Sequence, residues 1–178
     1  MTREERIQVV LDKFGKYVVQ QARANLTRQR KNVTKDLYDS IEWTAEASKS
    51  GESFSATLSM LDYGQFQDSG VKGKSSTYGS AQGSPFRFGT GTGKKGGLTE
   101  AMQKWVRARR FQFRQKNGKF MSYDSTAFLI ARSVYQKGIP ASFFYSRPFN
   151  LAFQKLPAEL VEAYALTPDD FKEFLKKK

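Results

Sequence analysis

The segment IEWTAEA at residues 41–47 alternates between apolar and polar side chains, and FSATLSM at residues 54–60 does the same. Alternation with a period of two is typical of a strand with one buried face. Lys49-Ser50-Gly51-Glu52, between the two segments, is rich in turn-forming residues. Residues 41–60 therefore predict an antiparallel β-hairpin.

The residues before this hairpin follow a helical period. A single apolar stripe at steps of three and four residues predicts an amphipathic helix over residues 2–30. Thr2 followed by Glu5 fits a capping box at the start of that helix. The stripe has to pack against the chain's own sheet or against a neighbouring molecule. It consists of Ile7, Leu11, Phe14, Val18 and Ala22.

Helical spacing returns after residue 97, and predicts helices over residues 98–110, 122–136, 148–156 and 167–176. The first of these is expected to bury Leu98, Ala101, Met102, Trp105 and Ala108, and the second Ala127, Ile130, Ala131 and Val134. Pro157 is the expected break after the third helix. Between the first two helices, the pair Asn117-Gly118 predicts a tight turn joining two short strands.

Together these elements predict an α+β fold in which a small antiparallel sheet is packed by the long N-terminal helix and the central helices. We expect one domain over residues 1–156, with a long Gly-rich loop at residues 69–97, and a helical C-terminal extension over residues 157–178. A loop of that length is uncommon unless it is functional or is ordered by a partner.

The charge balance points to a polyanionic partner. The chain has 178 residues, and 30 Lys and Arg against 17 Asp and Glu give it a net charge of +13. A field of that sign attracts nucleic acid, the commonest polyanion. The competing interpretation is a solubilising surface suited to high salt or acidic surroundings.

The chain contains no Cys and no His. Disulfides, thiolate nucleophiles, His-dependent acid–base catalysis and ordinary zinc sites are therefore excluded. A carboxylate site for Mg²⁺ would remain, but the acidic residues of the central region are scattered along the chain. We expect no catalytic residue, no metal site and no cofactor.

A nucleotide-binding interpretation of the glycine-rich region does not hold. Gly91-Thr92-Gly93-Lys94-Lys95-Gly96 formally matches the dinucleotide pattern G-x-G-x-x-G. That pattern needs a buried strand before it and an acidic residue about 20 positions later. Neither is present. As a phosphate loop it is one residue short, and Lys95 stands where Ser or Thr would hold magnesium.

A basic cluster follows this region. Residues 94–119 contain nine cations and one acid, Glu100. The cations are Lys94, Lys95, Lys104, Arg107, Arg109, Arg110, Arg114, Lys116 and Lys119. They predict contact with DNA phosphates without sequence preference. Phe111, Phe113 and Phe120 lie among them; stacking on single-stranded bases is one interpretation, and the core of a small hairpin is the favoured one.

The N-terminus lacks the apolar run of a signal peptide, and no segment approaches the apolar length of a membrane span. We therefore expect a protein that is made and assembled in the cytosol, without a membrane partner.

Three short motifs carry a resemblance to a known family. They are Tyr63-Gly64-Gln65-Phe66-Gln67-Asp68-Ser69-Gly70, Lys137-Gly138-Ile139-Pro140 and Arg147-Pro148-Phe149. With the order of the predicted elements over residues 2–156, they resemble the tail-completion (neck) proteins of tailed bacteriophages. The chain departs from that pattern in its longer glycine loop, its basic insertion at residues 104–119 and its C-terminal extension.

The resemblance implies a structural virion protein that forms a homo-oligomeric ring at the head–tail junction, assembled in the host cytoplasm, through which DNA passes. It implies portal or adaptor proteins and tail proteins as neighbours. It assigns Tyr63, Phe66, Gly70, Pro148 and Phe149 to packing or subunit contact. The alternatives are a free, sequence-nonspecific DNA- or RNA-binding protein and, less favoured, a magnesium-dependent nuclease.

Overall fold

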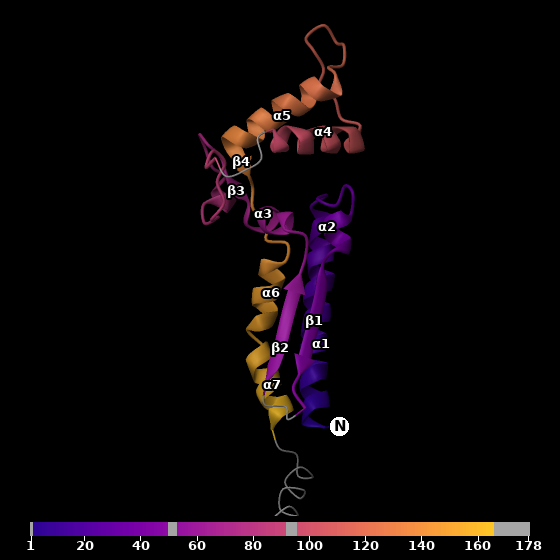
Figure 1. Ribbon diagram of the computed structural model, residues 1–178, viewed down its shortest axis with the longest axis vertical. Coiled ribbons are helices and arrows are strands. Elements are labelled where there is room, and N and C mark those ends of the chain that lie inside the picture. Colours follow the sequence, from indigo (N-terminus) through magenta and orange to yellow (C-terminus); the bar gives the residue numbers. More distant parts are fainter. Residues whose placement is uncertain (1, 50–52, 92–95, 166–178) are drawn as a thin grey trace, which may run out of the picture. The chain divides into compact units, whose positions relative to one another are not determined.

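The computed structural model describes residues 2–49, 53–91 and 96–165, and within them it has the predicted α+β fold (Figure 1). The elements are α1 (Arg3–Arg28), α2 (Asp36–Asp39), β1 (Glu42–Ala47), β2 (Phe54–Ser59), α3 (Tyr63–Ser69), β3 (Val71–Lys72), the 3-10 turn η1 (Gly79–Ala81), α4 (Gly97–Arg109), α5 (Tyr123–Lys137), β4 (Gly138–Ile139), α6 (Ser146–Phe153) and α7 (Leu156–Tyr164). β1 pairs with β2 and β3 pairs with β4, both antiparallel. None of the described helices is both long and apolar enough to cross a bilayer.

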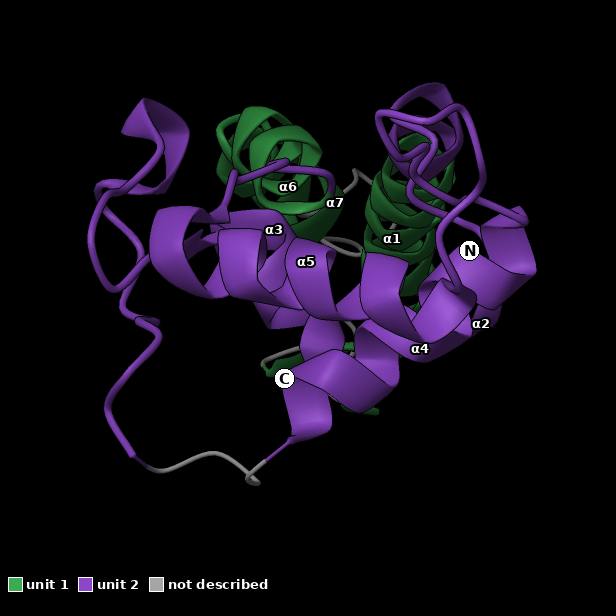
Figure 2. Cartoon of the chain, turned by 90° about the horizontal axis from the view of Figure 1, so that it is seen from above, with its two compact units in different colours: residues 1–23, 41–59, 145–178 green, residues 24–40, 60–144 purple. Residues whose placement is uncertain are grey.

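The chain divides into two compact units, each assembled from separate segments (Figure 2). Unit 1 takes in Met1–Arg23, Ile41–Ser59 and Tyr145–Lys178, and unit 2 takes in Ala24–Ser40 and Met60–Phe144. The predicted boundary between residues 156 and 157 falls inside α7.

The core of unit 1 is built on the apolar stripe of α1. As predicted, all five stripe residues are buried. Four of them, Ile7, Leu11, Phe14 and Val18, pack with half-buried side chains of the hairpin and with α6 and α7. These partners include Trp43, Ala45, Leu58, Phe149, Leu156 and Ala163. The capping box also forms, because Thr2 N donates to Glu5 Oε2 at 2.8 Å and Glu5 N donates to Thr2 Oγ1 at 3.1 Å.

The predicted β1–β2 hairpin is present, and its register runs from Glu42 opposite Ser59 to Ala47 opposite Phe54. β1 alternates between exposed and half-buried residues, whereas β2 is exposed throughout apart from the half-buried Leu58. Residues 50–52 of the predicted turn lie outside the described part of the chain. The hairpin therefore buries one face of β1 and leaves much of β2 accessible.

In unit 2, α4 packs against α5, and the short β3–β4 ladder holds the start of the Gly-rich segment. Lys72 N donates to Phe86 O and Phe88 N donates to Lys72 O, each at 2.9 Å. Ser84 Oγ donates to the carbonyl of Gly70 at 2.7 Å. Residues 70–88, predicted as an irregular loop, are thus tied to each other and to the end of α5 by hydrogen bonds.

The helices of unit 2 differ from their prediction in one respect. The start and the inward face of α5 are as expected: Ser122 accepts from Ser125 N at the N-cap, and Ala127 and Ala131 are buried. On α4, however, Val106 is the buried residue, and Ala101, Trp105 and Ala108 are exposed, so the predicted face was wrong. A single helical neighbour covers only a narrow strip of α4, which leaves the rest of the apolar face at the surface.

The third predicted helix is interrupted earlier than expected. α6 ends at Phe153 and α7 begins at Leu156, so the break lies before Pro157. Pro157 is in the first turn of α7, where a residue without an N–H group is tolerated. The helix predicted over residues 167–176 lies outside the described residues.

Candidate assembly and nucleic-acid interfaces

The outer edge of β1 is occupied by a side chain from α1. Gln8 Nε2 donates to Ala45 O at 2.9 Å, and Ala47 N donates to Gln8 Oε1 at 3.1 Å. The side-chain amide of Gln8 thereby takes the place that a peptide group of a further strand would occupy. Further along the same edge, Arg23 Nη2 donates to Ile41 O at 3.1 Å. Side chains of α1 therefore cover the β1 edge at Ile41, Ala45 and Ala47.

The outer edge of β2 has no such cover. Ser48 N donates to Ser53 O at 2.8 Å, and in an antiparallel pair every second residue pair exchanges bonds in this way. With the observed register, the backbone groups of Phe54, Ala56 and Leu58 point away from β1. In the described part of the chain, these groups have no hydrogen-bond partner across the outer edge.

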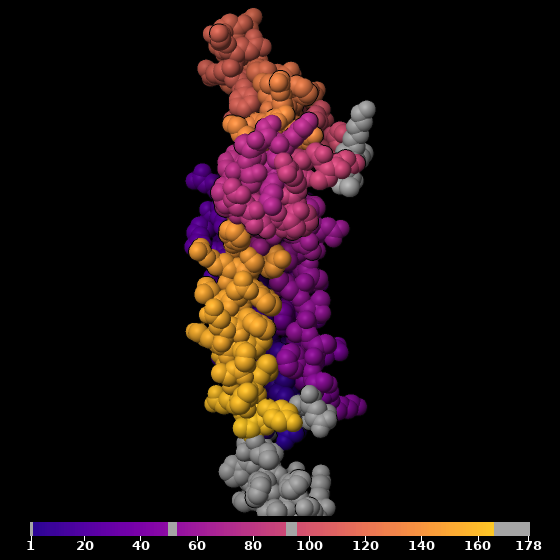
Figure 3. Space-filling view, turned by 90° about the vertical axis from the view of Figure 1, so that its left-hand side faces the viewer, coloured from indigo at the N-terminus to yellow at the C-terminus, as the bar shows by residue number. Residues whose placement is uncertain are grey.

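β2 also lacks the features that usually protect a free edge. Its sequence, Phe-Ser-Ala-Thr-Leu-Ser, contains no charged residue and no proline, and such residues are what normally prevent edge-to-edge pairing. Phe54 is 49% exposed. In the space-filling view, β2 forms a strip of surface beside α6 and α7 of the same unit (Figure 3). The strand is chemically competent to pair with another chain.

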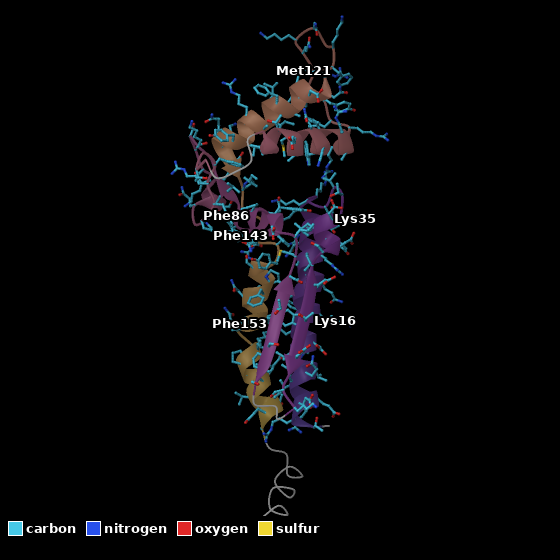
Figure 4. The ribbon with its side chains drawn as sticks, viewed as in Figure 1. Lys16, Lys35, Phe86, Met121, Phe143 and Phe153 are labelled. Atoms are coloured by element: carbon cyan, nitrogen blue, oxygen red, sulfur yellow. The ribbon has the colours of Figure 1, made fainter. Side chains whose placement is uncertain are left out.

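Further apolar side chains lie at the surface of unit 1. Val161 is 70% exposed, Leu151 55%, Val9 52% and Phe153, on α6, 51% (Figure 4). Exposed apolar residues are ordinary on protein surfaces, and it is a contiguous patch of them that marks a protein-binding site. Unit 1 therefore offers both an open strand edge and apolar contact area.

The basic cluster lies in unit 2, on α4 and on the loop that follows it. Lys104, Arg107 and Arg109 are on α4, Arg110 is its C-cap, and Arg114, Lys116 and Lys119 are in the loop. All seven are exposed. Lys94 and Lys95, the other two predicted members, lie outside the described residues.

Few anionic groups face these cations. Arg107 Nη2 lies 3.0 Å from Asp124 Oδ1, and both side chains are more than half exposed. Arg109 Nη2 donates to the carbonyl of Arg30 at 2.6 Å, and the Arg114 guanidinium lies 4.6 Å from the centroid of the Phe120 ring. Elsewhere in this cluster, over the ranges that are described, Lys104, Arg110, Lys116 and Lys119 form no ion pair. These charges are available to an external anion.

The predicted tight turn at Asn117-Gly118 is present. Gly118 N donates to Gln115 O, Gln115 N to Lys119 O and Met121 N to Phe113 O, each at 2.8 or 2.9 Å. Beside this turn is an open apolar hollow of about 540 Å³ lined by Phe113, Arg114, Met121, Leu129, Ile130, Ser133 and Val134. Met121 marks its position in Figure 4.

The aromatic residues of the loop do not form a hairpin core, which corrects the favoured sequence interpretation. Phe120 is 59% exposed, Phe111 40% and Phe113 36%. Phe111 and Phe113 contact each other edge-to-face, with centroids 5.2 Å apart. The two sides of this loop are joined by one isolated β-bridge, between Arg114 and Phe120. So small a structure cannot cover three large aromatic rings. Exposed aromatic and basic side chains therefore share one surface.

The family-motif residues are divided between the two units. In unit 2, Tyr63 is 44% and Phe66 42% exposed, and Phe66 meets Phe86 edge-to-face at 4.5 Å. Gly70 is buried with φ 73°, a conformation that favours glycine. In unit 1, Pro148 is buried, and the half-buried Phe149 lies 5.4 Å from the Phe14 ring. Phe66, Gly70, Pro148 and Phe149 therefore make contacts within their own units, whereas Tyr63 is exposed.

Sequence reasoning missed a charged pair within unit 2. Asp68 is 2% exposed, and its carbonyl accepts from Ser142 N and Phe143 N, both at 3.0 Å. Burial lowers the pKa of Lys31, and the negative charge of Asp68 opposes that shift. For Tyr63, burial raises the pKa and the charge of Asp36 adds to the effect. The sequence signal that could have indicated this pair was the position of the ionisable Asp68 inside the motif of residues 63–70.

Comparison with protein-family models, with curated proteins and with solved structures gives no match. Over the three described ranges, no group of three or more Asp, Glu, His or Cys side chains is arranged to hold a metal ion.

Proposed function

We propose that this protein is a structural, non-catalytic subunit of a homo-oligomeric ring at the head–tail junction of a tailed bacteriophage, through which DNA passes. The observation that carries the proposal is the group of exposed cations on α4 and its following loop. Seven of them lie within residues 104–119, and one, Arg107, pairs with a carboxylate among the described residues.

This basic surface suits the sugar–phosphate backbone of duplex DNA. Exposed Lys and Arg side chains bind phosphates and release counterions without reading the bases. A surface that DNA moves across has to hold phosphates of any sequence, and scattered point charges on a short helix and a loop meet that requirement.

Assembly is supported by unit 1. The exposed Val9, Leu151, Phe153 and Val161 supply apolar contacts of the kind that subunits use. Assembly would also gather the basic surfaces of many copies. Because each copy is strongly basic, their mutual repulsion would be relieved by DNA.

The resemblance of the three motifs to tail-completion proteins supplies the location. It supports placing the ring in the virion, between portal or adaptor proteins on one side and tail proteins on the other, after assembly in the host cytoplasm.

The second candidate is a free, sequence-nonspecific DNA- or RNA-binding protein. The exposed Phe111, Phe113 and Phe120 favour it, because single-stranded bases stack on aromatic side chains. Fluorescence anisotropy with duplex and single-stranded DNA of matched length distinguishes the two candidates. The ring proposal expects duplex binding at least as tight as single-strand binding. Strong preference for the single strand, lost in Phe113→Ala and Phe120→Ala, would favour the second candidate.

A further inference from the structure

The two edges of the β1–β2 hairpin are not equivalent. The Gln8 amide closes the edge of β1 at Ala45 and Ala47, whereas the outward backbone groups of β2 are open. A hairpin with two open edges could add copies without limit. One open edge allows a single addition, after which no edge of the sheet remains free.

We propose that β2 pairs antiparallel with β2 of a second copy of this chain, about a two-fold axis at Ala56, to form a closed four-stranded sheet. The outward-pointing residues are Phe54, Ala56 and Leu58, and antiparallel bonding requires them to face one another. The register that pairs all three places Ala56 opposite Ala56 of the second copy and Phe54 opposite Leu58.

Every cross-strand pair in this register matches in polarity. Phe54 and Leu58 share a face because side chains alternate along a strand, and Leu58 already packs against the core of unit 1. A Leu58 side chain from the second copy would cover Phe54, which is 49% exposed. On the opposite face, Ser55 would meet Thr57. These are favourable pairs.

Local charge does not oppose pairing of two copies at β2. The chain carries a net charge of +13, so copies repel each other over most of their surface. β2 has no charged residue, and Glu42 and Glu46 of the paired strand are on β1. In the four-stranded sheet, the two β1 strands would be about 14 Å apart, beyond the screening length at physiological salt.

This contact is two-fold, and it does not rest on the proposed ring. Neighbours around a cyclic ring meet through two different surfaces. The β2–β2 contact would therefore join free copies in pairs, or two rings face to face.

A cysteine scan tests the axis directly, because the chain has no native Cys. Ala56→Cys places two thiols opposite each other, with Cα atoms about 5.5 Å apart, within disulfide range. We expect rapid oxidation to a covalent species of twice the 20.2 kDa chain mass. Thr44→Cys, on the exposed face of β1, is the matched control and should stay at single-chain mass on a non-reducing gel.

Introducing a charge at the same position provides a second test. Ala56→Lys and Ala56→Glu each place like charges opposite one another across the axis. Each should weaken the β2–β2 contact by at least about tenfold in Kd, measured by sedimentation, while mixing the two variants should restore it. Circular dichroism checks that both fold. The proposal is overturned if Ala56→Cys forms no more dimer than Thr44→Cys, or if the charge variants associate as the parent does.

Discussion

Gly15 of α1 lies directly against the indole of Trp43 of β1. A Cβ at residue 15 would overlap Cδ1, Cγ and Nε1 of that ring. The close approach lets the ring reach Phe14, whose centroid is 5.3 Å away. It also buries Trp43 Nε1 without a hydrogen-bond partner among the described residues. Packing between α1 and the hairpin in unit 1 thus depends on residue 15 being glycine, which has no side chain.

Gly15→Ala should destabilise the protein although alanine is the better helix former. The helical preference is worth about 1 kcal/mol, and overpacking at a tight contact typically costs about 1–3 kcal/mol. The free energy of unfolding from urea denaturation should therefore fall. In a Trp43→Leu background, where the ring is absent, the same substitution should be neutral or stabilising. A Gly15→Ala protein more stable than its parent would contradict the packing described here.

Phe149→Ala should cost more stability than Phe66→Ala. Phe149 is half-buried against Phe14 and stacks on Phe153, so its loss should cost about 2–3 kcal/mol. Phe66 is 42% exposed and meets Phe86 at one edge. Its loss should cost under about 1.5 kcal/mol. Thermal or urea unfolding of the two variants gives the comparison, and the reverse order would be inconsistent with these environments.

Lys31 should make stability rise with pH on the alkaline side. Its pKa in the folded protein lies below 10.5, mainly because of burial. At pH values between the lowered pKa of the folded protein and the ordinary pKa of 10.5, the unfolded chain binds more protons than the folded one. The free energy of unfolding therefore increases with pH in that range. Lys31→Met removes this contribution, whereas Lys16→Met, at an exposed position, should not.

Urea unfolding of the parent and both variants between pH 7 and pH 9.5 measures the effect. That range stays below the ordinary pKa of Tyr63, 10.0, whose upward shift acts in the opposite direction above it. Parallel pH profiles for the parent and Lys31→Met would show that the lysine makes no such contribution.

Local patterns predicted the local elements well. The capping box, the α1 stripe and the β1–β2 hairpin depend on residues close in sequence, so local sequence patterns were enough to find them. The hydrogen bonding of Gln8 to the β1 edge could not be predicted from the sequence. A polar residue on an amphipathic helix is ordinary, and its partners Ala45 and Ala47 are 37 and 39 residues away. The two-unit division, the buried face of α4 and the Lys31–Asp68 pair likewise depend on long-range packing.

Replacing Lys104, Lys116 and Lys119 together by Ala should weaken DNA binding and flatten its salt dependence. If each contacts one phosphate, the slope of log Kobs against log salt should decrease in magnitude by about 2–3. Stability should hardly change, because exposed charges contribute little. Anisotropy titrations of duplex DNA at several salt concentrations give the slope.

The matched control replaces Lys16, Arg147 and Lys155, which are exposed cations of unit 1. It lowers the net charge equally and should leave the slope closer to that of the parent. An unchanged slope for the unit 2 variant, together with failure of head–tail joining in a reconstituted assembly, would instead assign the cluster to an acidic protein partner.

We propose that this chain works as one copy in a closed homo-oligomer. Native mass spectrometry of nucleic-acid-free protein, over a range of protein concentrations and salts, measures the copy number. We expect a single species with a fixed copy number greater than two that persists on dilution. A monomer under every condition, gaining mass when DNA is added and at no other time, would contradict it.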